Sequence, residues 1–450
     1  MEKKVALTIA GSDSSGGAGI QADLKAFTAL GVHGATVITC ITAQNTKRVE
    51  EIYKLPARII ESQIDTIIGD IKPDTIKTGM LYDREIVNIV AKKIKQYRLK
   101  TVVDPVMIAT SGDALSKNDF VKVLKNKLIP VAYVVTPNIH EANNLTGRKI
   151  KDITDVKKAC KEIHELGPRY VLIKGGHLEG KNVDDVFFDG KKLTVFSLPR
   201  IPNRLAHGSG CTLSALVTGY LALGEKPTES VRKAKYVLWN MIKQGYKPGK
   251  GTDVLNFSSN ATTDVPSLFP TNEHFTVWFE LKKTVDELLA FLPRDFVPEV
   301  GMNFGYALPN AKKLEDICAL NGRIVKTKDK PIRCGSIDFG SSKHIASIIL
   351  AAMKSDEKTR CAMNIKYSKE NLEKCEKACF KIGTFDRLKE PEDIKSTMEW
   401  GTTQSIQKLG VTPDIIYDTG GVGKEPMIRI LGNNPKDVLN RARILVKLKK

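Results

Sequence analysis

Residues 1–250 alternate short runs of β-branched residues with stretches whose apolar side chains recur at helical spacing, and no other feature constrains the fold as strongly. Val5–Ala10 predicts a strand, and Ile20, Leu24, Phe27 and Leu30 then fall on one face of a helix. Further strands are expected at 35–42, 101–106, 133–136 and 170–173, with helices at 84–97 and 155–166. Such alternation predicts a doubly wound sheet with mainly parallel central strands.

Two later segments extend this organisation. Val183–Phe188 and Leu193–Leu198 flank Asp189-Gly190, which predicts an antiparallel hairpin added to the sheet. Residues 256–270 are polar, lack periodicity and end in prolines, so we expect a linker between a domain at 1–255 and a second α/β domain at 271–450. In the second domain, helices are expected at 285–291, 343–353 and 368–380, and strands at 301–306 and 363–367.

The formal net charge of +19 favours anionic partners such as phosphates, nucleic acid or anionic lipid. A lysine-rich solvated surface is the alternative. Basic runs interleaved with stacking aromatics are absent, which argues against nucleic acid. No run of about 18 apolar residues is present, so we expect no membrane span. The eight cysteines contain no CxxC pair and no secretory signal is evident, so we expect reduced thiols in the cytoplasm.

A glycine-rich segment follows the first expected strand. Residues 10–19 read Ala-Gly-Ser-Asp-Ser-Ser-Gly-Gly-Ala-Gly and lead into a helix. Glycines let a ligand approach the backbone closely, and doubly wound folds bind ligands at the carboxyl ends of their strands. Many tight turns have the same composition, so this segment alone leaves a ligand site and a plain turn equally open.

A second segment, residues 207–212 (His-Gly-Ser-Gly-Cys-Thr), comes directly before an amphipathic helix. Backbone N–H groups at a helix N-terminus can hold a transferring phosphoryl group. Cys211 lies at this terminus, where the helix dipole is expected to lower the pKa of the thiol. The resulting thiolate could take a proton from a substrate hydroxyl. The alternative is a buried structural cysteine after a turn.

Three more polar clusters follow expected strands. Asp104 follows one strand, Asn138 and Glu141 follow the next, and Lys174 follows a third. Phosphoryl transfer needs carboxylates that hold Mg²⁺ through water and a lysine that neutralises phosphate. Each cluster alone also fits a loop or a helix cap, but all of them fall at the carboxyl ends of strands in one sheet. Gly420–Glu425 is not a Walker A motif, because glutamate stands where Ser or Thr must bind Mg²⁺.

Residues 1 to about 255 resemble the hydroxymethylpyrimidine/phosphomethylpyrimidine kinases of the ribokinase-like superfamily. The stretches that carry the resemblance cover this half in order: Leu7–Lys25, Ala43–Thr46, Lys77–Leu81, Asp104–Met107 with Ser111–Asp113, Thr136–Glu141, Lys174–His177 and His207–Ser214. The resemblance implies an α/β/α sandwich around a mainly parallel sheet. It also implies ATP and Mg²⁺ as cofactors, and two successive phosphorylations of a hydroxymethylpyrimidine.

The same resemblance implies roles for particular residues. Gln44 would pair with the aminopyrimidine edge, and Cys211 stands where related sugar kinases carry an aspartate base. The residues implied to shape the pyrimidine pocket are Gly11, Asp23, Met80 and Met107. Those implied in the anion hole and in binding Mg-ATP are Gly208, Ser209, Gly210, Lys174, Asn138, Asp104 and Glu141. One departure is Ala206, where the family pattern has a threonine.

In the second half, residues 335–344 (Gly-Ser-Ile-Asp-Phe-Gly-Ser-Ser-Lys-His) predict a glycine- and hydroxyl-rich loop that opens a helix, again a pattern typical of an anion site. His344 would lie near the start of that helix, and Arg323 could clamp a diphosphate through two parallel hydrogen bonds. The alternatives are a solvated first-turn residue for His344 and a surface salt bridge for Arg323. Cys375 and Cys379, four residues apart on an expected helix, make a poor zinc site.

This half resembles the archaeal-type thiamine-phosphate synthase domain, which is found fused to such kinases. The matching stretches are Met302–Ala307, Gly322–Val325, Phe339–His344, Met363–Tyr367, Phe385–Pro391, Thr397–Gly401, Pro413–Asp418 and Gly420–Gly432. The resemblance implicates Arg323 and His344 in coupling, in which diphosphate leaves the pyrimidine methylene and the thiazole nitrogen attacks the cation. These two residues and the helix terminus would stabilise the leaving diphosphate by positive charge. Weaker candidates for the same charge role are Lys343, Arg387, Lys424 and Arg429.

We therefore expect a cytoplasmic bifunctional enzyme of thiamine biosynthesis that acts on small molecules and forms a homo-oligomer. Three alternatives stay open. The second domain could be inactive in synthesis, or it could be a ligand-sensing module, although no helix-turn-helix segment for DNA is evident. The kinase could instead phosphorylate pyridoxal-like rings, which the Gln44 pocket and the attached synthase-like domain argue against.

Overall fold

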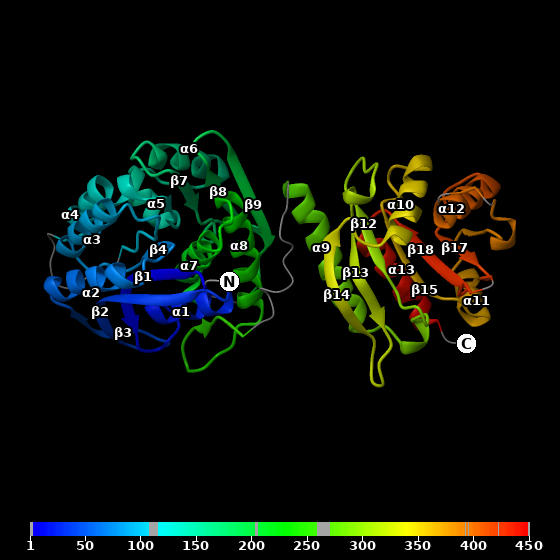
Figure 1. Ribbon diagram of the computed structural model, residues 1–450, viewed down its shortest axis with the longest axis horizontal. Helices are drawn as coiled ribbons and strands as arrows, with labels where there is room; N and C mark the ends of the chain where they lie inside the picture. Colours follow the sequence, from blue (N-terminus) through cyan, green and yellow to red (C-terminus); the bar gives the residue numbers. More distant parts are fainter. Residues whose placement is uncertain are drawn as a thin grey trace. The chain divides into compact units, whose positions relative to one another are not determined.

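The computed structural model describes residues 3–107, 116–202, 206–258, 271–391, 393–394, 396–421 and 423–448. Its chain divides into two compact units, Met1–Val265 and Pro266–Lys450 (Figure 1). Residues 259–270, which hold most of the expected linker, and Ser111–Asp113 of the kinase resemblance lie outside the described residues. None of the helices in the described part is long and apolar enough to cross a bilayer.

The N-terminal unit is built on a sheet whose described residues form nine strands in the order β3-β2-β1-β4-β5-β6-β7-β8-β9. These strands are β1 (Val5–Asp13), β2 (His33–Gln44), β3 (Val49–Lys54), β4 (Thr75–Thr78), β5 (Thr101–Val103), β6 (Val134–Val135), β7 (Tyr170–Ile173), β8 (Asn182–Phe188) and β9 (Leu193–Pro199). Neighbours from β2 to β7 pair in parallel, whereas β3, β8 and β9 pair antiparallel at the edges. The carboxyl ends of β1, β4, β5, β6 and β7 therefore meet at one edge of the sheet.

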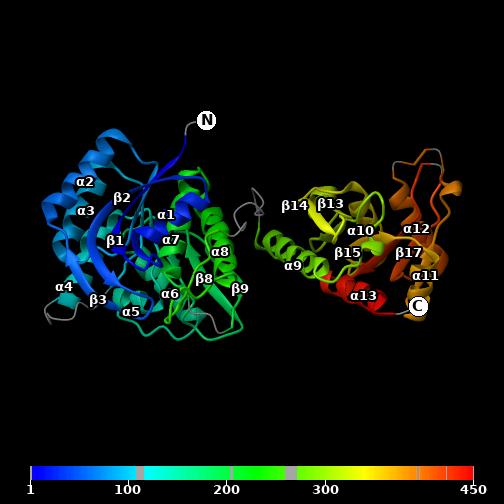
Figure 2. The ribbon, with the colours of Figure 1, turned by 90° about the horizontal axis from the view of Figure 1, so that it is seen from below.

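Helices cover both faces of this sheet (Figures 1 and 2). They are α1 (Gly19–Ala29), α2 (Ala57–Asp70), α3 (Arg84–Tyr97), α4 (Ser116–Val123), α5 (Ile139–Thr146), α6 (Ile153–His164), α7 (Ser209–Ala222) and α8 (Pro227–Lys243). Successive strand residues point to opposite faces. Val102 and Val134 therefore pack in the core under α1, α7 and α8, and Val103 and Val135 pack in the core under α2 to α6. The expected α/β/α sandwich is confirmed.

Several expected elements have the bounds that the sequence predicts, and others differ for a visible reason. The helix at 84–97 and the hairpin of β8 and β9 are present as expected. The strand expected at 101–106 ends at Val103, and Pro105 cannot donate to the ladder. β1 runs on to Asp13 through an irregularity in its pairing between Ala10 and Ser12, so the start of the glycine-rich segment is itself part of the sheet.

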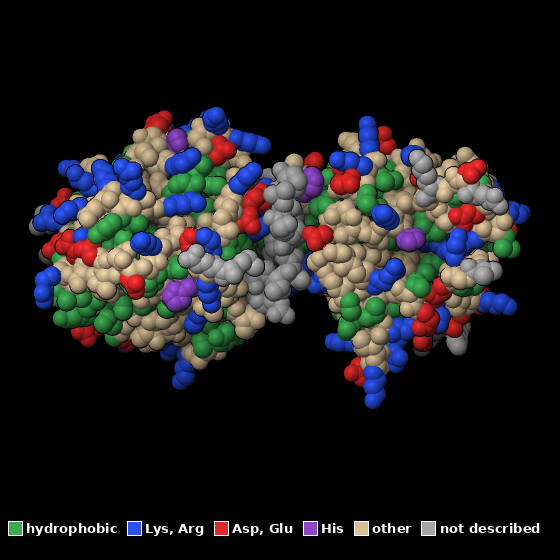
Figure 3. All heavy atoms as spheres, viewed as in Figure 1, with side chains coloured by type: hydrophobic (Ala, Val, Ile, Leu, Met, Phe, Trp, Pro, Cys, Tyr) green, Lys and Arg blue, Asp and Glu red, His purple; other side chains and the backbone are tan. Residues whose placement is uncertain are grey.

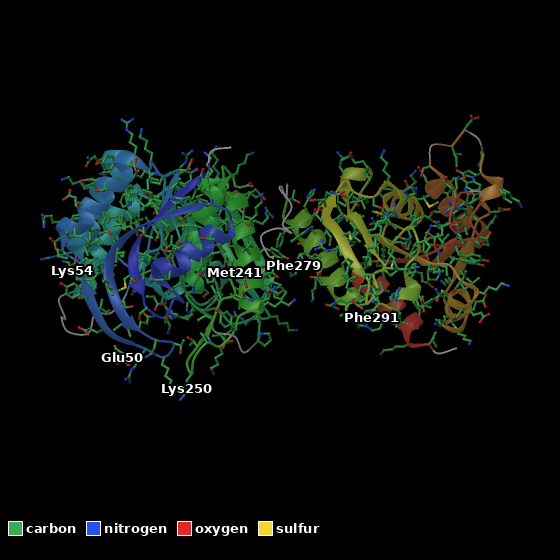
Figure 4. All side chains as sticks on the ribbon, turned by 60° about the horizontal axis from the view of Figure 1, so that its bottom comes forward. Glu50, Lys54, Met241, Lys250, Phe279 and Phe291 are labelled. Atoms are coloured by element: carbon green, nitrogen blue, oxygen red, sulfur yellow. The ribbon has the colours of Figure 1, made fainter. Side chains whose placement is uncertain are left out.

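Edge strand β3 is tied to the start of α3 by ion pairs. Lys54, labelled in Figure 4, places its Nζ 2.5 Å from Asp83, the N-cap of α3, and 2.7 Å from Glu85. Charged side chains on an edge strand oppose its pairing with another sheet. A short two-stranded sheet of β10 (Ala206–His207) and β11 (Asp253–Val254) lies apart from the main sheet and leads into α7.

The C-terminal unit has a sheet whose described residues form seven strands in the order β14-β13-β12-β15-β18-β17-β16. The strands are β12 (Phe304–Ala307), β13 (Ile317–Val325), β14 (Ile332–Phe339), β15 (Cys361–Lys366), β16 (Ile382–Thr384), β17 (Ile415–Asp418) and β18 (Met427–Gly432). All neighbours pair antiparallel except β16 and β17, which are parallel. A second α/β domain is therefore confirmed, with a mainly antiparallel sheet.

Its helices lie on both faces of the sheet (Figure 2). They are α9 (Asn272–Leu289), α10 (Lys343–Ser355), α11 (Lys369–Lys377), α12 (Thr397–Leu409) and α13 (Pro435–Lys447). α9 packs against α13, and α10 packs against α12. Ile345 and Ile349 of α10 cover Gly305 on one face of β12. Beyond the end of α9, the guanidinium of Arg443 lies 4.9 Å from the ring centre of Phe291, which Figure 4 labels.

Three expectations for this unit are wrong in detail. The helix expected at 285–291 is the end of α9, which begins at Asn272 and is capped by Thr271. The loop expected at 335–344 is strand β14 as far as Phe339, so only 340–342 form the loop before α10. The helix expected at 368–380 ends at Lys377, which leaves Cys379 outside it in a left-handed conformation.

On the face shown in Figure 3, lysines and arginines are scattered over both units and interspersed with acidic side chains. The basic side chains thus form no single dominant patch on this face.

Candidate active sites

In the N-terminal unit, the strand ends bring a carboxylate and a lysine together. Asp104 follows β5 and is 2% exposed. Its Oδ1 lies 2.7 Å from Nζ of Lys174, which follows β7, and its Oδ2 accepts a hydrogen bond of 3.1 Å from Ser214 of α7. The sheet edge is therefore joined to the first turns of α7, as expected if these clusters form one site.

Asn138 and Glu141 form a capping box at the start of α5. The amide of Glu141 donates to Oδ1 of Asn138 at 2.9 Å, and the amide of Asn138 donates to Oε2 of Glu141 at 2.7 Å. Burial raises the pKa of the Glu141 carboxyl to about 7; Lys174 opposes this rise and Asp104 adds to it. Two carboxyls therefore lie near one lysine. The carboxylate oxygens are donors that suit a divalent cation.

The N-terminus of α7 is formed by glycines that pack against the glycine-rich segment. Gly208, its N-cap, has a φ of +80°, and a Cβ there would lie 1.8 Å from the carbonyl oxygen of Gly17. No side chain caps this terminus in the described part of the chain. At Gly210 a Cβ would lie 3.3 Å from Nζ of Lys174. The amides of Gly208, Ser209 and Gly210 are therefore placed beside a cation, as an anion hole requires.

Cys211 lies among two lysines and two carboxyls, and the pKa of its thiol differs from the expectation. Burial raises the pKa of the Cys211 thiol to about 11. Lys77 and Lys174 lower this pKa, and Asp104 and Asp23 raise it. The expected lowering is therefore wrong for the ligand-free protein, because desolvation of a thiolate outweighs the favourable charges nearby.

Asp23 lies beneath the site and is not exposed to a ligand. Its carboxylate is fully buried, lies 2.8 Å from Nζ of Lys77 and accepts a 2.6 Å hydrogen bond from Thr8. Lys77 was not singled out as a site residue from the sequence. The carboxylates of Asp23 and Asp104 raise the pKa of Lys77 above its usual value although burial alone would lower it, so Lys77 is a buried cation beside Asp23.

The expected pyrimidine partner, Gln44, is linked to His207. Its Nε2 lies 2.9 Å from Nε2 of His207, which lies 3.2 Å from Oδ2 of Asp13. Burial would raise the pKa of Asp13, but hydrogen bonds from His207, Ser15 and the Ala18 amide lower it to about 2. Neither His207 nor Asp13 was predicted as a site residue, although both fall within the stretches that carry the resemblance.

The other expected pocket residues divide into two places. A Cβ on Gly11 would lie 2.7 Å from Sγ of Cys40 and 3.5 Å from Sδ of Met80, so Gly11 and Met80 line one spot. Met107 accepts a 3.5 Å hydrogen bond at its sulfur from Asn144 of α5. Met107 therefore lies toward α5.

In the C-terminal unit, the first turn of α10 lies within electrostatic reach of arginines from three strands or loops. His344 lies in that turn, after Ser342, which caps the helix with a φ of +57°. A left-handed conformation is costly for serine and is common at functional sites. Partial desolvation lowers the pKa of His344, although its side chain is exposed, and Arg323 of β13, Arg387 after β16 and Arg429 of β18 lower it further. His344 is therefore a neutral imidazole near pH 7, not the expected cation.

The four weaker candidates differ in their surroundings. Arg387 and Arg429 both pair with Asp418 at 2.6 Å, a residue that was not predicted. Lys424 lies 3.1 Å from Glu390, and Lys343 is exposed next to His344. Cys375 is buried and Cys379 is exposed, and no cluster of three or more potential metal ligands occurs among the described residues.

Comparison with known families gives two matches. The model of the phosphomethylpyrimidine kinase family matches residues 13–256, and the model of the family of thiamine-phosphate synthase ThiN matches residues 280–444. The first of these covers more than half of the chain.

Among curated proteins, the bifunctional thiamine biosynthesis protein ThiDN of Methanocaldococcus jannaschii is 34% identical, with 99% of each chain covered. A hydroxymethylpyrimidine/phosphomethylpyrimidine kinase of Rhizobium meliloti is 48% identical over 52% of this chain and 88% of its own length. The bifunctional protein ThiED of Geobacter sulfurreducens is 44% identical over 56% of this chain, and the match spans 51% of that protein.

Solved structures match the N-terminal half. The pyridoxal kinase of Staphylococcus aureus in complex with AMP-PCP and pyridoxal is 36% identical, with a TM-score of 0.54 over 57% of this chain and 94% of that chain. An ADP complex of Bacillus subtilis pyridoxal kinase is 38% identical, with a TM-score of 0.54 over 57% and 98%. The chain therefore belongs to the family of bifunctional thiamine biosynthesis enzymes that join a phosphomethylpyrimidine kinase to a ThiN-type thiamine-phosphate synthase.

Proposed function

We propose that the N-terminal unit phosphorylates 4-amino-5-hydroxymethyl-2-methylpyrimidine with ATP, first to the monophosphate and then to the diphosphate. The C-terminal unit then couples the diphosphate with thiazole phosphate, giving thiamine phosphate and free diphosphate. The observation that carries the kinase assignment is the convergence of Asp104, Lys174 and Cys211 on the N-terminus of α7. For the synthase it is the gathering of Arg323, Arg387 and Arg429 around His344.

Nucleotide binding is supported by the AMP-PCP and ADP complexes of the similar kinases. Magnesium fits the donor set, because Asp104 and Glu141 both supply carboxylate oxygens and Asp104 lies close enough to raise the pKa of Glu141. When bound with ATP, the ion would neutralise charge on the phosphates. Lys174 and the amides of 208–210 hold the transferred phosphoryl group, and Asn138 keeps Glu141 in place through the capping box.

Cys211 accepts the proton of the substrate hydroxyl as the hydroxyl oxygen bonds to the γ-phosphorus of ATP, and the bond from this phosphorus to the oxygen that leaves with ADP breaks. This base role requires the thiolate, which the cations of Lys77 and Lys174 favour. Gln44 reads the aminopyrimidine edge once the ring displaces its contact with His207. Gly11 and Met80 line the ring pocket together, and the Met80 sulfur lies 3.5 Å from the Cβ position of Gly11.

In the synthase, the bond between the pyrimidine methylene and the diphosphate oxygen breaks, and the leaving diphosphate keeps the electron pair. The thiazole ring nitrogen then forms the new C–N bond to the methylene. Arg323, Arg387 and Arg429 stabilise the charge that develops on the leaving group. His344 enters as a neutral imidazole, which can donate one hydrogen bond and accept another.

The second candidate substrate is pyridoxal, which the solved structures of 36–38% identical pyridoxal kinases favour. The two substrates would be separated by steady-state rates with hydroxymethylpyrimidine and pyridoxal at matched concentrations. The pyrimidine assignment predicts a higher kcat/KM for hydroxymethylpyrimidine. A strong preference for pyridoxal would contradict it. A cytoplasmic location is supported by eight free cysteines, and a homo-oligomer stays a prediction.

A further inference from the structure

Asp418, the last residue of β17, is a fully buried carboxylate that takes no part in the steps above. Its Oδ1 lies 2.6 Å from Nε of Arg387 and accepts a 2.9 Å hydrogen bond from the amide of Gly420. Its Oδ2 lies 2.6 Å from Nη2 of Arg429 and accepts a 3.2 Å hydrogen bond from Nη2 of Arg387. Both carboxylate oxygens are therefore fully used by two arginines and one amide.

One anion shared by two guanidiniums leaves a positive charge in excess. Burying such a cluster costs desolvation energy, so it is a poor device for stability alone. Arg429 is 2% exposed, and its guanidinium lies 5.3 Å from the ring centre of Phe385, which fixes its orientation. The cluster therefore holds two cations in defined places beside α10.

Arg387 and Arg323 have N–H groups that are not used in hydrogen bonds among the described residues. Arg387 turns its Nε and Nη2 edge toward Asp418, and its Nη1 makes no hydrogen bond within the described residues. The side chain of Arg323 likewise makes no hydrogen bond or ion pair with any described residue. Phe385, which packs against Arg429, lies in one buried cluster with Ile345 in the first turn of α10, so the arginine cluster lies beside that turn. The lowering of the His344 pKa by both arginines agrees with this placement. A planar fork with free donors matches two oxygens of a phosphate.

We propose that Asp418 is a positioning residue of the synthase, which holds Arg387 so that its outer N–H group, together with Arg323, receives a diphosphate at the N-terminus of α10. Arg429 stays buried behind them, where its Nη1 donates to the Met427 carbonyl, and contributes only its charge. This inference rests on the proposed coupling function. Asp418 does not touch the substrate. It fixes the direction of the guanidiniums, so its loss would weaken diphosphate recognition without removing a cation.

The test compares the full-length wild type with Asp418→Asn and with a matched control, Asp414→Asn. Asp414 pairs with Arg441 just before the same strand, where both side chains are about a quarter exposed. Affinity for inorganic pyrophosphate would be measured by calorimetry, and KM for each coupling substrate by product formation. Asp418→Asn should weaken pyrophosphate binding at least about tenfold and raise KM for the pyrimidine diphosphate by a similar factor. KM for thiazole phosphate should stay within about twofold, which a general structural defect would not allow, and the control should change neither.

A second variant covers the case in which Asp418→Asn does not fold. Arg387→Lys keeps the charge but loses the two-point contact with Asp418, and the same loss of pyrophosphate affinity is expected. The proposal would be overturned if folded Asp418→Asn or Arg387→Lys bound pyrophosphate as tightly as the wild type. It would also be overturned if the wild type did not bind pyrophosphate. A wild type that binds pyrophosphate but forms no thiamine phosphate would instead overturn the proposed function. The loss of affinity in the variants would then still support the positioning role.

Discussion

Cys211 shows how strongly single residues in this protein depend on what surrounds them. The sequence places it at a helix N-terminus, which favours a thiolate, and the structure adds burial, which disfavours one. Burial is the larger influence, so the thiol is protonated near neutral pH in the ligand-free protein. Lys77 and Lys174 are the neighbouring groups that favour a thiolate, because they lower the pKa of Cys211.

A base with a pKa of about 11 predicts a distinct pH dependence of the kinase. The thiolate fraction rises tenfold for each pH unit below that pKa, so log kcat should rise with pH between 7 and 9. Cys211→Ala should lower kcat by about 100-fold or more and remove this slope, while pyrimidine binding stays measurable. Rates over this pH range, with pyrimidine affinity from calorimetry, provide the check. A variant with near-normal turnover would show that Cys211 is not the base.

His344 gives a second prediction at the same scale. The guanidinium of Arg323 is one of the groups that lower the pKa of His344, so Arg323→Gln should raise that pKa toward its ordinary value. The sign follows because a nearby cation disfavours the imidazolium, and removing the cation removes that penalty. Histidine NMR titration, with the His344 signal assigned through His344→Asn, measures the shift. A pKa that stays unchanged or falls would mean that Arg323 and His344 do not share one site.

At the scale of elements, the start of α7 depends on a close backbone approach. Gly208 combines a φ of +80° with a carbonyl oxygen 1.8 Å from where a Cβ would lie. Gly224 after α7 has a similar φ of +88° but no atom within 4 Å of that position. Substitutions at the two glycines therefore distinguish two effects. Both positions have the backbone strain of a positive φ, but only Gly208 also has a steric conflict.

Gly208→Ala should therefore lower kinase kcat/KM by roughly 100-fold, because the anion hole and the glycine-rich segment must move apart. Gly224→Ala should lose only about 1–3 kcal/mol of stability and keep its activity. Kinase rates and urea unfolding of both variants make the comparison. Equal activity losses in the two would contradict a specific role for the packing of Gly208 on Gly17.

The elements also show what could be predicted from the sequence. The parallel core of the N-terminal unit follows from its apolar runs, and the site residues follow from their place after those runs. β14 could not be predicted, because its glycine and serine content is typical of a loop. Gly322 and Gly335 face each other across β13 and β14 so closely that a Cβ on either would lie about 2 Å from a carbonyl oxygen of the other strand. Pairing, which is a long-range feature, decides the structure there.

The site of the C-terminal unit was less accessible to sequence reasoning. Arg323 and His344 follow from the family resemblance, but Asp418 ends an ordinary apolar strand and carries no local signal. Only the order β18-β17-β16 brings Arg429, Asp418 and the loop of Arg387 together. In the N-terminal unit, Lys77 was missed for a similar reason, since a lysine in a short strand gives no indication that it is fully buried against Asp23.

For the whole molecule, each unit has its own core and its own site, so damage to one should spare the other. Arg323→Ala or His344→Ala should lower coupling by about 100-fold and leave kinase rates unchanged, so that pyrimidine diphosphate accumulates. Lys354→Ala, which removes an exposed ion pair with Glu399 in the same unit, is the control and should leave coupling unchanged. Both rates can be read from one chromatographic time course. Parallel loss of both activities would indicate misfolding.

The central claim, two successive activities in one chain, is tested most directly by the products of the purified protein. Hydroxymethylpyrimidine, thiazole phosphate and Mg-ATP would be supplied together, and each phosphorylated product would be resolved by mass. Thiamine phosphate is the predicted result, with pyrimidine monophosphate and diphosphate before it. Pyrimidine diphosphate alone would support the kinase activity and favour an inactive or ligand-sensing C-terminal unit. The absence of any phosphorylated pyrimidine would contradict the account as a whole.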